Sequence, residues 1–336
     1  MADLRRVQKT GGSTLIVSLP KRWAEATGIK SGDTLSIIPG DGDSLIIDPH
    51  PVDKRVKRVK KLTTDGSDPN HFFRRLIAVY ICGYDTIEVI SKEPMSTEMR
   101  ASIRKFTRMV IGPEITEEDI RSVLMKDLSD SEGFGLRSVV RRIFRITFSM
   151  LKDSIDAIRD ENADVSRDVV TRDEEVDRFY WLLSKQFTLM LKKPRYLQDE
   201  PNTEESLNFF LIGRILERVA DHAKIISDNH VTVLENSGKN GIDTETRKLI
   251  VQAGELSQEM LTNSFDAFIK GDTLLANLTI DRTKELNVLY NDGISSISRM
   301  KPAITIPISG IFESVQRTGM YSTDIAEIAI NNQEND

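Results

Sequence analysis

Four carboxylates at helical spacing are the residues of this chain best suited to bind an ion. Asp173 and Asp177 lie one helical turn apart, and so do Glu217 and Asp221. Asp173 occupies one position of a 4-3-4-3-4 spacing whose other members are apolar or aromatic, and an unpaired carboxylate in such a seam is costly. If the two segments pack antiparallel, the four carboxylates converge, and their repulsion favours a bound multivalent cation. The pattern therefore predicts a metal site formed by these four acids.

The ligand types narrow the choice of metal without settling it. Oxygen ligands favour hard ions, so iron, manganese, magnesium and calcium all stay open. Salt bridges are the alternative to a metal, because Arg172 and Arg178 flank the first acid pair and could neutralise part of its charge. His222 adjoins Asp221 but points about 100° away on a helix, which indicates a packing or surface residue.

Helices must position these acids, and the chain is helical in pattern from residue 136 onward. Apolar periodicity predicts three helices over 137–161, 164–192 and 204–230, and three more over 245–270, 272–299 and 308–331. The segment also repeats itself, because Met150-Leu151-x-x-Ser154-x-Asp156-Ala157 recurs as Met260-Leu261-x-x-Ser264-x-Asp266-Ala267. The repeat predicts two three-helix units, over 136–232 and 243–331, with antiparallel neighbouring helices.

The second unit departs from the first at the acid positions. Each unit carries aspartates nine residues apart, namely Asp164 with Asp173 and Asp272 with Asp281. This spacing aligns Asp281-x-x-x-Glu285 with the first acid pair, whereas Gln316 and Met320 replace the two third-helix acids. Two acids are lost, so the second unit is predicted to bind metal weakly or not at all.

The segment 1–62 carries positive charge in an otherwise acidic chain. It holds twelve Lys and Arg against seven Asp and Glu, a net charge of +5 in a chain whose total is −6. Short apolar segments between turn residues predict strands over 15–19, 34–38 and 44–48, a helix over 21–27 and a hairpin turn at Asp41-Gly42-Asp43. Strands this short cannot enclose a core alone, so we expect a homodimer.

Four motifs with intact spacing fill most of residues 1–50: Thr10-Gly11-Gly12-Ser13, Leu19-Pro20-Lys21-Arg22-Trp23, Gly28-Ile29-Lys30-Ser31-Gly32-Asp33 and Asp43-Ser44-Leu45-Ile46-Ile47. On these motifs the segment resembles the SpoVT/AbrB family of swapped-hairpin DNA-binding domains. The resemblance implies an interlaced dimeric β-barrel that presents to DNA the basic side chains of Arg5, Arg6 and Lys9 on the first strand and of Lys21 and Arg22 after Pro20. Paired copies would double these cations into a phosphate-neutralising surface. A barrel that only dimerises the chain is the alternative.

Residues 51–135 form a predicted α/β connecting segment. The basic run Lys54–Lys61 indicates a linker or an edge strand, and turn residues over 65–70 mark a boundary. Periodicity predicts helices over 71–84 and 96–111 and strands over 86–91 and 123–128. Cys82 lies in an apolar stretch and is expected to be buried.

Composition and missing motifs argue against several classes of protein. A length of 336 residues predicts about two domains, and a single cysteine excludes an intramolecular disulfide and multi-cysteine metal sites. No apolar run long enough to span a bilayer is present, and the charged N-terminus lacks an apolar leader, so we expect a cytoplasmic protein without membrane insertion. The sequence contains no P-loop, dinucleotide fingerprint or Ser-His-Asp arrangement, and we expect no enzyme.

Two acidic motifs extend the interpretation of the helical region: Asp173-Glu-Glu-Val-Asp177 and Leu216-Glu217-Arg218-Val219-Ala220-Asp221-His222-Ala223. On these motifs residues 136–331 resemble the PhoU family of phosphate uptake regulators, and the whole chain resembles an archaeal-type fusion of that family with an AbrB-like domain. The resemblance implies metal ions, often iron, bound through these acids. The predicted fold is mainly α: tandem three-helix bundles with an N-terminal swapped-hairpin β-barrel and a small α/β connecting segment.

Three functions follow from these observations. The first is a dimeric DNA-binding regulator of phosphate homeostasis with a metal-binding sensing or docking body. The second is an accessory negative regulator that docks on the ATPase of a phosphate transporter or on a phosphate-signalling protein, with the barrel serving only to dimerise. The third, a carboxylate-bridged metal enzyme, requires Glu-x-x-His pairs, and the sequence contains none.

Overall fold

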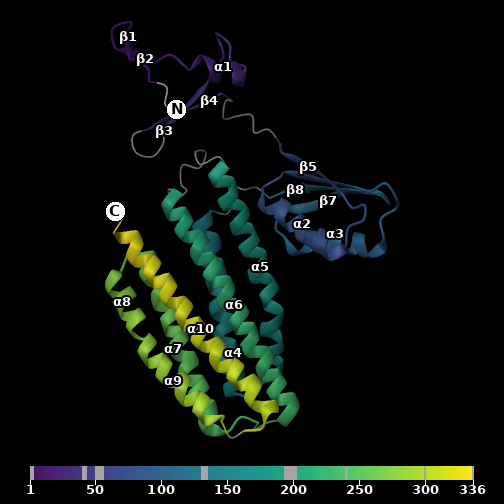
Figure 1. The fold of residues 1–336 in the computed structure, drawn as a ribbon, viewed down its shortest axis with the longest axis vertical. Helices are drawn as coiled ribbons and strands as arrows, with labels where there is room; N and C mark the ends of the chain where they lie inside the picture. The colour runs from purple at the N-terminus through teal and green to yellow at the C-terminus, as the bar shows by residue number, and fades with distance from the viewer. Residues whose placement is uncertain are drawn as a thin grey trace. The chain divides into compact units, whose positions relative to one another are not determined.

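A computed structural model describes residues 4–39, 44–49, 57–129, 135–192, 203–238, 241–298 and 300–334. The chain divides into two compact units, Met1–Val56 and Lys57–Asp336 (Figure 1). The predicted hairpin turn at Asp41-Gly42-Asp43 and the start of the basic run, 54–56, lie outside the described residues. None of the helices in the described ranges combines the length and the apolar character that a bilayer span requires.

Two hairpins and one short helix form the N-terminal unit. β1 (Gln8–Thr10) pairs antiparallel with β2 (Thr14–Ile16), and β3 (Ser36–Pro39) pairs antiparallel with β4 (Leu45–Asp48). The helix α1 (Lys21–Thr27) falls between the two hairpins in the chain and ends at a left-handed glycine. The two hairpins are separate sheets, so the described strands of one chain form no closed barrel by themselves; the predicted barrel consists of two interlaced chains.

The N-terminal unit has no core of its own among its described residues. None of them is buried, and large apolar side chains lie in solvent, including Leu4 at 92% exposed, Leu15 at 68% and Leu45 at 69%. A segment that exposes this much apolar surface needs a further surface to cover it.

A four-stranded sheet with two helices opens the second unit. Its elements are β5 (Val59–Thr63), α2 (Pro69–Ile81), β6 (Thr86–Ile90), α3 (Thr97–Met109), β7 (Pro113–Glu118) and β8 (Ser122–Asp127). The strand order is β5-β6-β8-β7, with β5 and β6 parallel and the other pairs antiparallel. The side chains of Asp68 and Ser96 cap the two helices, whose apolar faces meet the sheet in one core.

This α/β layer corrects two expectations. The acidic segment of β7 was not predicted as a strand, and it forms because it pairs with β8 at the edge of the sheet, where polar side chains stay in water. Cys82 is exposed rather than buried, because it caps the C-terminus of α2 beyond the apolar face. The edge-strand interpretation of the basic run is confirmed for Val59–Lys61, which lie in β5.

The α/β layer packs directly on the helical region. Lys185 of the long helix α5 (Ala163–Lys192) forms a buried ion pair with Asp127 at the end of β8. Lys192 Nζ donates to the Cys82 carbonyl oxygen at 2.9 Å. The helix that carries Asp173 and Asp177 therefore also anchors the α/β layer.

Helices from α4 onward form the two three-helix units that the repeat predicts. The first contains α4 (Leu136–Arg159), α5 and α6 (Thr203–Ser237), and the second contains α7 (Thr244–Lys270), α8 (Thr273–Asp281) with α9 (Thr283–Ser296), and α10 (Pro302–Gln333). Helices α6 and α10 pack against each other across the boundary, so one apolar core runs through both units (Figure 1). The prediction of a mainly helical fold with tandem bundles is confirmed.

Three helices differ clearly from their predicted bounds. Helix α6 continues to Ser237, beyond the predicted end at 230. The predicted helix 272–299 is divided at Arg282 into α8 and α9. The last helix begins at Pro302, before the predicted start at 308, because proline is well tolerated at the first position of a helix. Pro307 lies inside this helix without ending it.

Matching contacts show which residues of the two units correspond. The Thr147 hydroxyl donates to the Leu216 carbonyl at 3.3 Å, and the Ser257 hydroxyl donates to the Val315 carbonyl at 2.9 Å. Thr147 of the first helix in the first unit therefore corresponds to Ser257 in the second unit, and Leu216 of the third helix corresponds to Val315.

The offset between Thr147 and Ser257 also holds along the second helices. Arg172 Nη1 donates to the Ser149 hydroxyl at 3.1 Å, and Arg282 Nη1 donates to Glu259 Oε1 at 3.0 Å, so both arginines reach back to equivalent positions of the preceding helix. The break between α8 and α9 thus falls beside the position that corresponds to Asp173 in the unbroken α5.

Candidate metal centre

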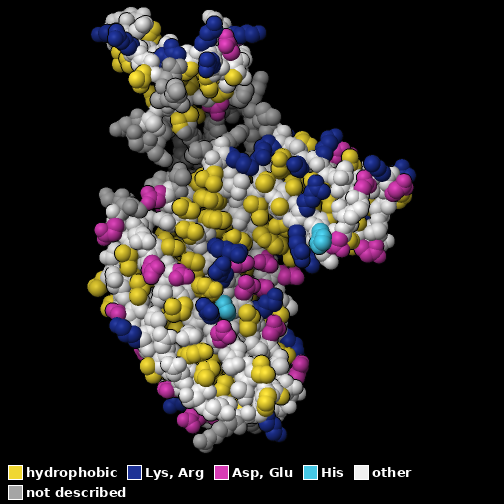
Figure 2. Space-filling model, viewed as in Figure 1, with side chains coloured by type: hydrophobic (Ala, Val, Ile, Leu, Met, Phe, Trp, Pro, Cys, Tyr) yellow, Lys and Arg dark blue, Asp and Glu magenta, His cyan; other side chains and the backbone are white. Residues whose placement is uncertain are grey.

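Helices α5 and α6 bring the four predicted acids together on one side of the first unit. Asp173 is buried, with 7% of its surface exposed, while Asp177 and Glu217 are half-buried and Asp221 is exposed. Figure 2 shows Asp and Glu side chains gathered at mid-height of the helical region, with Lys and Arg side chains beside them. The exposure of the acids thus increases from Asp173, inside the unit, to Asp221, at its surface.

Burial and mutual repulsion disfavour the charged forms of these carboxyls. Burial, followed by the charges of Asp173, Glu217 and Asp221, raises the pKa of Asp177 to about 7. Burial also raises the pKa of Glu217 and that of Asp221, with neighbouring acids adding to the effect. The centre is therefore short of positive charge when all four acids are ionised, and a proton or a bound cation would supply it.

Two cations in this centre were missed by sequence reasoning: Arg214, whose Nη1 lies 3.3 Å from Glu217 Oε2, and Lys224. Lys224 Nζ of α6 donates to Asp173 Oδ2 at 2.7 Å. Its position three residues after Asp221, on a helix facing Asp173, was the signal that could have identified it. Asp173 therefore has a counter-ion on the opposite helix.

The two arginines that offered a salt-bridge alternative do not pair with the four acids. Arg172 pairs with Asp153 at 2.8 Å and with Asp168 at 3.0 Å. Arg178 has a buried Nε without a hydrogen-bond partner among the described residues. The salt-bridge alternative survives in another form, through Lys224 with Asp173 and Arg214 with Glu217.

The donor set fits a hard cation. Oε2 of Glu217 is buried and accepts no hydrogen bond from the described residues, although Arg214 Nη1 lies 3.3 Å away. Carboxylate oxygens from two facing helices are ligands of the kind that such ions prefer. In the described ranges no three Asp, Glu, His or Cys side chains are already arranged as a metal site, so ligation requires these carboxylates to close around the ion.

The second unit has neutral residues at all four acid positions. Counted from the equivalent pairs Thr147 with Ser257 and Leu216 with Val315, the acids correspond in chain order to Thr283, Asn287, Gln316 and Met320. Gln316 Nε2 donates to Asn287 Oδ1 at 2.8 Å, so a neutral amide hydrogen bond stands where Glu217 and Asp177 face each other in the first unit. The predicted loss of acids in the second unit thus extends to the whole set.

This correspondence corrects the predicted alignment of Asp281 and Glu285 with the first acid pair. Both residues are exposed, and each has a cation of its own: Lys284 lies 3.1 Å from Asp281, and Arg282 lies 3.0 Å from Glu285. The nine-residue aspartate spacing misled because Asp272 caps α8 and corresponds to Asn162, which stands two positions before Asp164.

His222 packs against the second unit, as its direction on the helix predicts. Its ring lies 5.7 Å from the Tyr321 ring of α10, and burial lowers its pKa. It faces away from the acids and adds no ligand to them.

The five predicted DNA-binding cations are all exposed. Lys9 lies in β1, but Arg5 and Arg6 precede this strand, which corrects their predicted place on it. Lys21 and Arg22 begin α1, where Lys21 Nζ lies 3.8 Å from Glu25.

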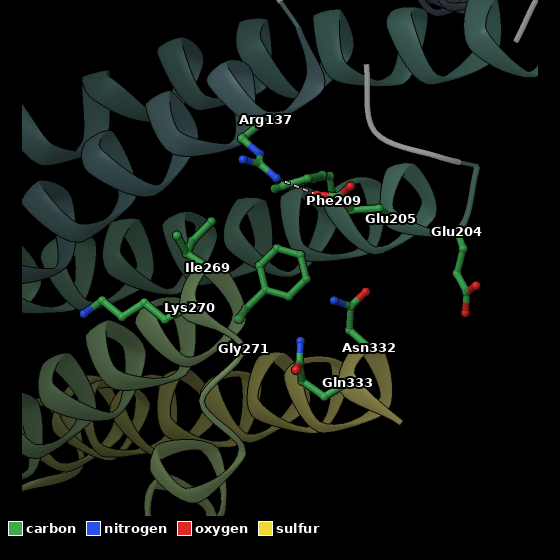
Figure 3. Close-up of a pocket in the computed structure, with 10 residues that line it drawn as sticks. Arg137, Glu204, Glu205, Phe209, Ile269, Lys270, Gly271, Asn332 and Gln333 are labelled. Carbon is green, nitrogen blue, oxygen red and sulfur yellow. Dashed lines mark hydrogen bonds and ion pairs between the residues drawn. The ribbon is translucent and has the colours of Figure 1, made fainter. Parts of the chain in front are cut away.

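A cavity of about 300 Å³ lies where α4 and α6 begin and α7 and α10 end (Figure 3). Arg137 turns toward Glu205, with Nη2 2.7 Å from Oε1, and Lys270 pairs with Asp266 at 2.7 Å. Both cations lining the cavity are thus engaged by carboxylates, and we assign it no chemistry.

Family models match both parts of the chain. Residues 140–229 and 250–329, which together are just over half of the chain, match the PhoU domain. Residues 8–55 match the model for antidote-toxin recognition MazE, a bacterial antitoxin. The second match covers the segment with the AbrB-like motifs, so the chain has a MazE/AbrB-like N-terminal unit before its PhoU region.

Relatives and solved structures agree with the larger match. Phosphate-specific transport system accessory protein PhoU homologues of Zymomonas mobilis and Clostridium acetobutylicum are 23% and 22% identical, over 59% and 44% of this chain and 84% and 75% of their own. The crystal structure of PhoU from Pseudomonas aeruginosa aligns with a TM-score of 0.53 and 17% identity, and that of Streptococcus pneumoniae with 0.51 and 14%. These alignments cover 60% of this chain and 96% and 94% of those structures, and they show the fold.

Proposed function

Because the chain belongs to the PhoU family and carries a MazE/AbrB-like N-terminal unit, we propose that it is a homodimeric, DNA-binding regulator of phosphate uptake whose helical region binds a hard metal ion. One observation carries this proposal: the chain combines two features. Its N-terminal unit has exposed cations and no core of its own among the described residues, and its helical region brings four acids together between α5 and α6. The first suits a polyanion, and the second suits a multivalent cation.

Dimerisation is supported by the apolar surface of the N-terminal unit. Leu4, Leu15 and Leu45 cannot be covered by the described residues of that unit, none of which is buried. A second copy supplies the same apolar surface under two-fold symmetry, which is the commonest way to complete such a fold. Removing residues 1–56 should therefore abolish or weaken the dimer measured by light scattering.

DNA binding is supported by five exposed cations within one short stretch of chain, from Arg5 to Arg22. In a dimer they become ten, enough to neutralise a run of phosphates. Such contacts position a protein on DNA, whereas base recognition needs further groups. A regulator that binds DNA in this way would act in the cytoplasm.

The metal would be held by Asp173, Asp177, Glu217 and Asp221, and it would supply the positive charge that this centre lacks. The proposed mechanism is coupling between sites rather than catalysis. An ion, phosphate or a protein partner that prefers one conformation of the helical region changes DNA affinity to the extent that the two conformations differ in binding DNA.

Charge reversal tests the DNA part of the proposal. Lys21→Glu with Arg22→Glu should weaken binding to all sequences and flatten the fall of log affinity with log salt, by about 0.9 for each phosphate that is no longer neutralised. Lys248→Glu with Lys284→Glu, the same charge change at exposed residues of the helical region, is the matched control and should have little effect. Absence of DNA binding by the unaltered protein at low salt would contradict this part.

Neutralising two acids tests the metal part. Asp177→Asn with Asp221→Asn should abolish stoichiometric metal in elemental analysis, and a chelator should lower the melting temperature of the unaltered protein but not of the variant. The residues that correspond to these two in the second unit are already neutral, so that unit should bind metal weakly or not at all. A chelator-insensitive melting curve of a metal-free native protein would favour the salt-bridge alternative.

A second candidate function is an accessory role at a transporter. The names of the two relatives assign this role to them, and the PhoU match of this chain favours it. In that case the N-terminal unit only dimerises the chain. The two functions separate in one experiment, because the accessory protein would bind a phosphate transporter ATPase or a phosphate-signalling protein and would not be retained on phosphate-uptake promoter DNA.

A further inference from the structure

The acid centre of the first unit already contains a cation, the ammonium group of Lys224. It lies 2.7 Å from Asp173, the most buried of the four acids. We propose that Lys224 holds the place of the metal in the metal-free protein, and that a multivalent cation binds by displacing Lys224 from Asp173. This inference rests on the metal centre proposed above and concerns how that centre selects and admits its ion.

Depth is the first reason to assign this role to Lys224. Asp173 is 7% exposed, so a counter-ion must reach it from within the interface of α5 and α6. Arg172 is next to it in sequence but pairs with Asp153 and Asp168 instead. Lys224 is therefore the cation in direct contact with the acid that most needs compensation.

The ammonium group of Lys224 can also move away from Asp173. The side chain of Lys224 is 38% exposed, so its stem reaches from the surface of α6 inward to Asp173. Lysine carries a compact charge on four flexible carbons, and rotation of these carbons returns the ammonium to water without moving either helix. Displacement thus needs a side-chain change, with no rearrangement of the bundle.

Displacement selects ions by charge. A monovalent ion that replaced Lys224 would exchange one positive charge for another and gain little. A divalent or trivalent ion brings more charge to this centre, where Glu217 has Arg214 at 3.3 Å but Asp177 and Asp221 form no ion pair with the described residues. Such an ion can also bind about six or more oxygens, whereas an ammonium group donates to three at most. Lys224 is in this sense a specificity-determining residue of the centre.

The second unit provides an internal comparison for this assignment. Counted from the equivalent residues Leu216 and Val315, Lys224 corresponds to Thr323, whose hydroxyl donates to the Met320 carbonyl of its own helix at 2.7 Å. The residue at the position of Asp173 is Thr283. The lysine is therefore absent where the acids are absent, while the three-helix packing is retained, so the packing itself does not require Lys224.

Calorimetry with Mn²⁺, and with Fe²⁺ under anaerobic conditions, tests the inference. Lys224→Met should bind Mn²⁺ about tenfold more tightly than the unaltered protein, because the ion no longer competes with the ammonium. The metal-free variant should melt at a lower temperature than the metal-free unaltered protein, since Asp173 has lost its counter-ion, and metal should restore the difference. Lys270→Met is the matched control, because it breaks an ion pair of the same 2.7 Å length with Asp266 outside the centre. It should change neither the affinity for Mn²⁺ nor that for Fe²⁺.

Acetylation of lysines followed by mass spectrometry tests the same point without a substitution. Adding Mn²⁺ to the full-length protein should increase acetylation of Lys224 and leave that of Lys270 unchanged. If metal binds but Lys224 acetylation does not rise, or if Lys224→Met binds metal no more tightly, the displacement is wrong and the metal centre stands. If neither protein binds either ion, the metal centre itself is wrong, and this inference falls with it.

Discussion

The two three-helix units share a backbone plan and differ in polarity. Equivalent hydroxyls of their first helices donate to equivalent carbonyls of their third helices, and equivalent arginines of their second helices donate to equivalent positions of the first helices. Yet the first unit places four acids and a lysine between α5 and α6, where the second has neutral side chains, including an amide pair.

This difference shows what the fold needs. The second unit keeps the three-helix plan without any of the five charges, although its second helix is divided at Arg282, so the charges are not required to build the bundle. Charged groups at partly buried positions reduce stability unless they are compensated. Their presence in only one unit is therefore better explained by binding than by folding.

The largest expected effect is the transfer of the centre to the second unit. Thr283→Asp, Asn287→Asp, Gln316→Glu and Met320→Asp together reproduce the four acids without the lysine. We expect this variant to bind about one further equivalent of Mn²⁺ in calorimetry and to be less stable than the unaltered protein when metal-free. Met320→Asp alone is the control and should add no site; no gain by the fourfold variant would show that acid positions alone do not determine the centre.

The two units should also differ in how much they contribute to the loss of stability at acid pH. The first unit buries a hydrogen bond of 2.8 Å between Ser166 Oγ and His230 Nδ1, whereas the corresponding residues of the second are Ala276 and Ala329. Burial lowers the pKa of His230 to about 4 from the usual 6.5. Between these pH values the unfolded chain holds a proton that the folded chain does not, so His230 by itself contributes a loss of stability of roughly 3 kcal/mol as pH falls through this window. In the metal-free protein Asp177, whose pKa is raised to about 7, contributes a gain over the same window, so the loss is measured as a difference between variants.

Replacing the pair by the alanines of the second unit tests this prediction. Ser166→Ala with His230→Ala should lower stability at neutral pH, since it leaves a cavity. Between about pH 6.5 and 4, urea unfolding should show the double variant losing roughly 3 kcal/mol less stability than the unaltered protein. His71→Ala, at an exposed histidine, is the control and should keep the slope of the unaltered protein. An unchanged slope in the double variant would mean that other groups dominate acid unfolding.

In the first unit Gly213 of α6 lies against Leu183 of α5. The corresponding residues of the second unit are Phe312 and Gly293, so there the glycine is on the other helix of the pair. This difference predicts a smaller effect. A Cβ on Gly213 would meet the flexible end of Leu183, whereas a Cβ on Gly293 would meet the rigid ring of Phe312 at 2.3 Å. Gly293→Ala should therefore cost about 1–3 kcal/mol in denaturant unfolding. Gly213→Ala should be nearly neutral, because rotation of Leu183 and the better helix propensity of alanine compensate for the close approach. Equal destabilisation of the two variants would contradict this account of the packing.

The smallest effect is expected at Asp281, the residue that sequence spacing mistakenly aligned with Asp173. Its ion pair with Lys284 is exposed, so Asp281→Asn should change stability by less than about 0.5 kcal/mol and leave metal content unchanged. Asp173→Asn, the same change at the buried acid, should reduce metal content instead. A loss of metal in the Asp281 variant would restore the alignment that the hydrogen bonds between the helices reject.

Local patterns were sufficient to predict much of this molecule. The helices, the internal repeat and the spacing of the four acids depend on periodicity within single segments. In α2, for example, the buried residues Phe72, Leu76, Val79 and Tyr80 recur at helical spacing. Helix α5 likewise continues unbroken through Asp173 and Asp177. Such features follow from sequence because neighbours three and four residues apart share a helix face whatever surrounds it.

Tertiary structure alone decided the rest. Lys224 reaches Asp173 only because α6 lies against α5, and the two residues are 51 positions apart in the chain. Only matched hydrogen bonds between helices showed which residues of the two units correspond. Aligning Asp281 with Asp173 keeps the nine-residue spacing of aspartates, but it is wrong by two positions, and two positions along a helix turn a side chain to a different face. The sequence by itself determined which charges the chain carries and how they are spaced, whereas packing determined which of them meet, because a counter-ion is chosen by distance in space.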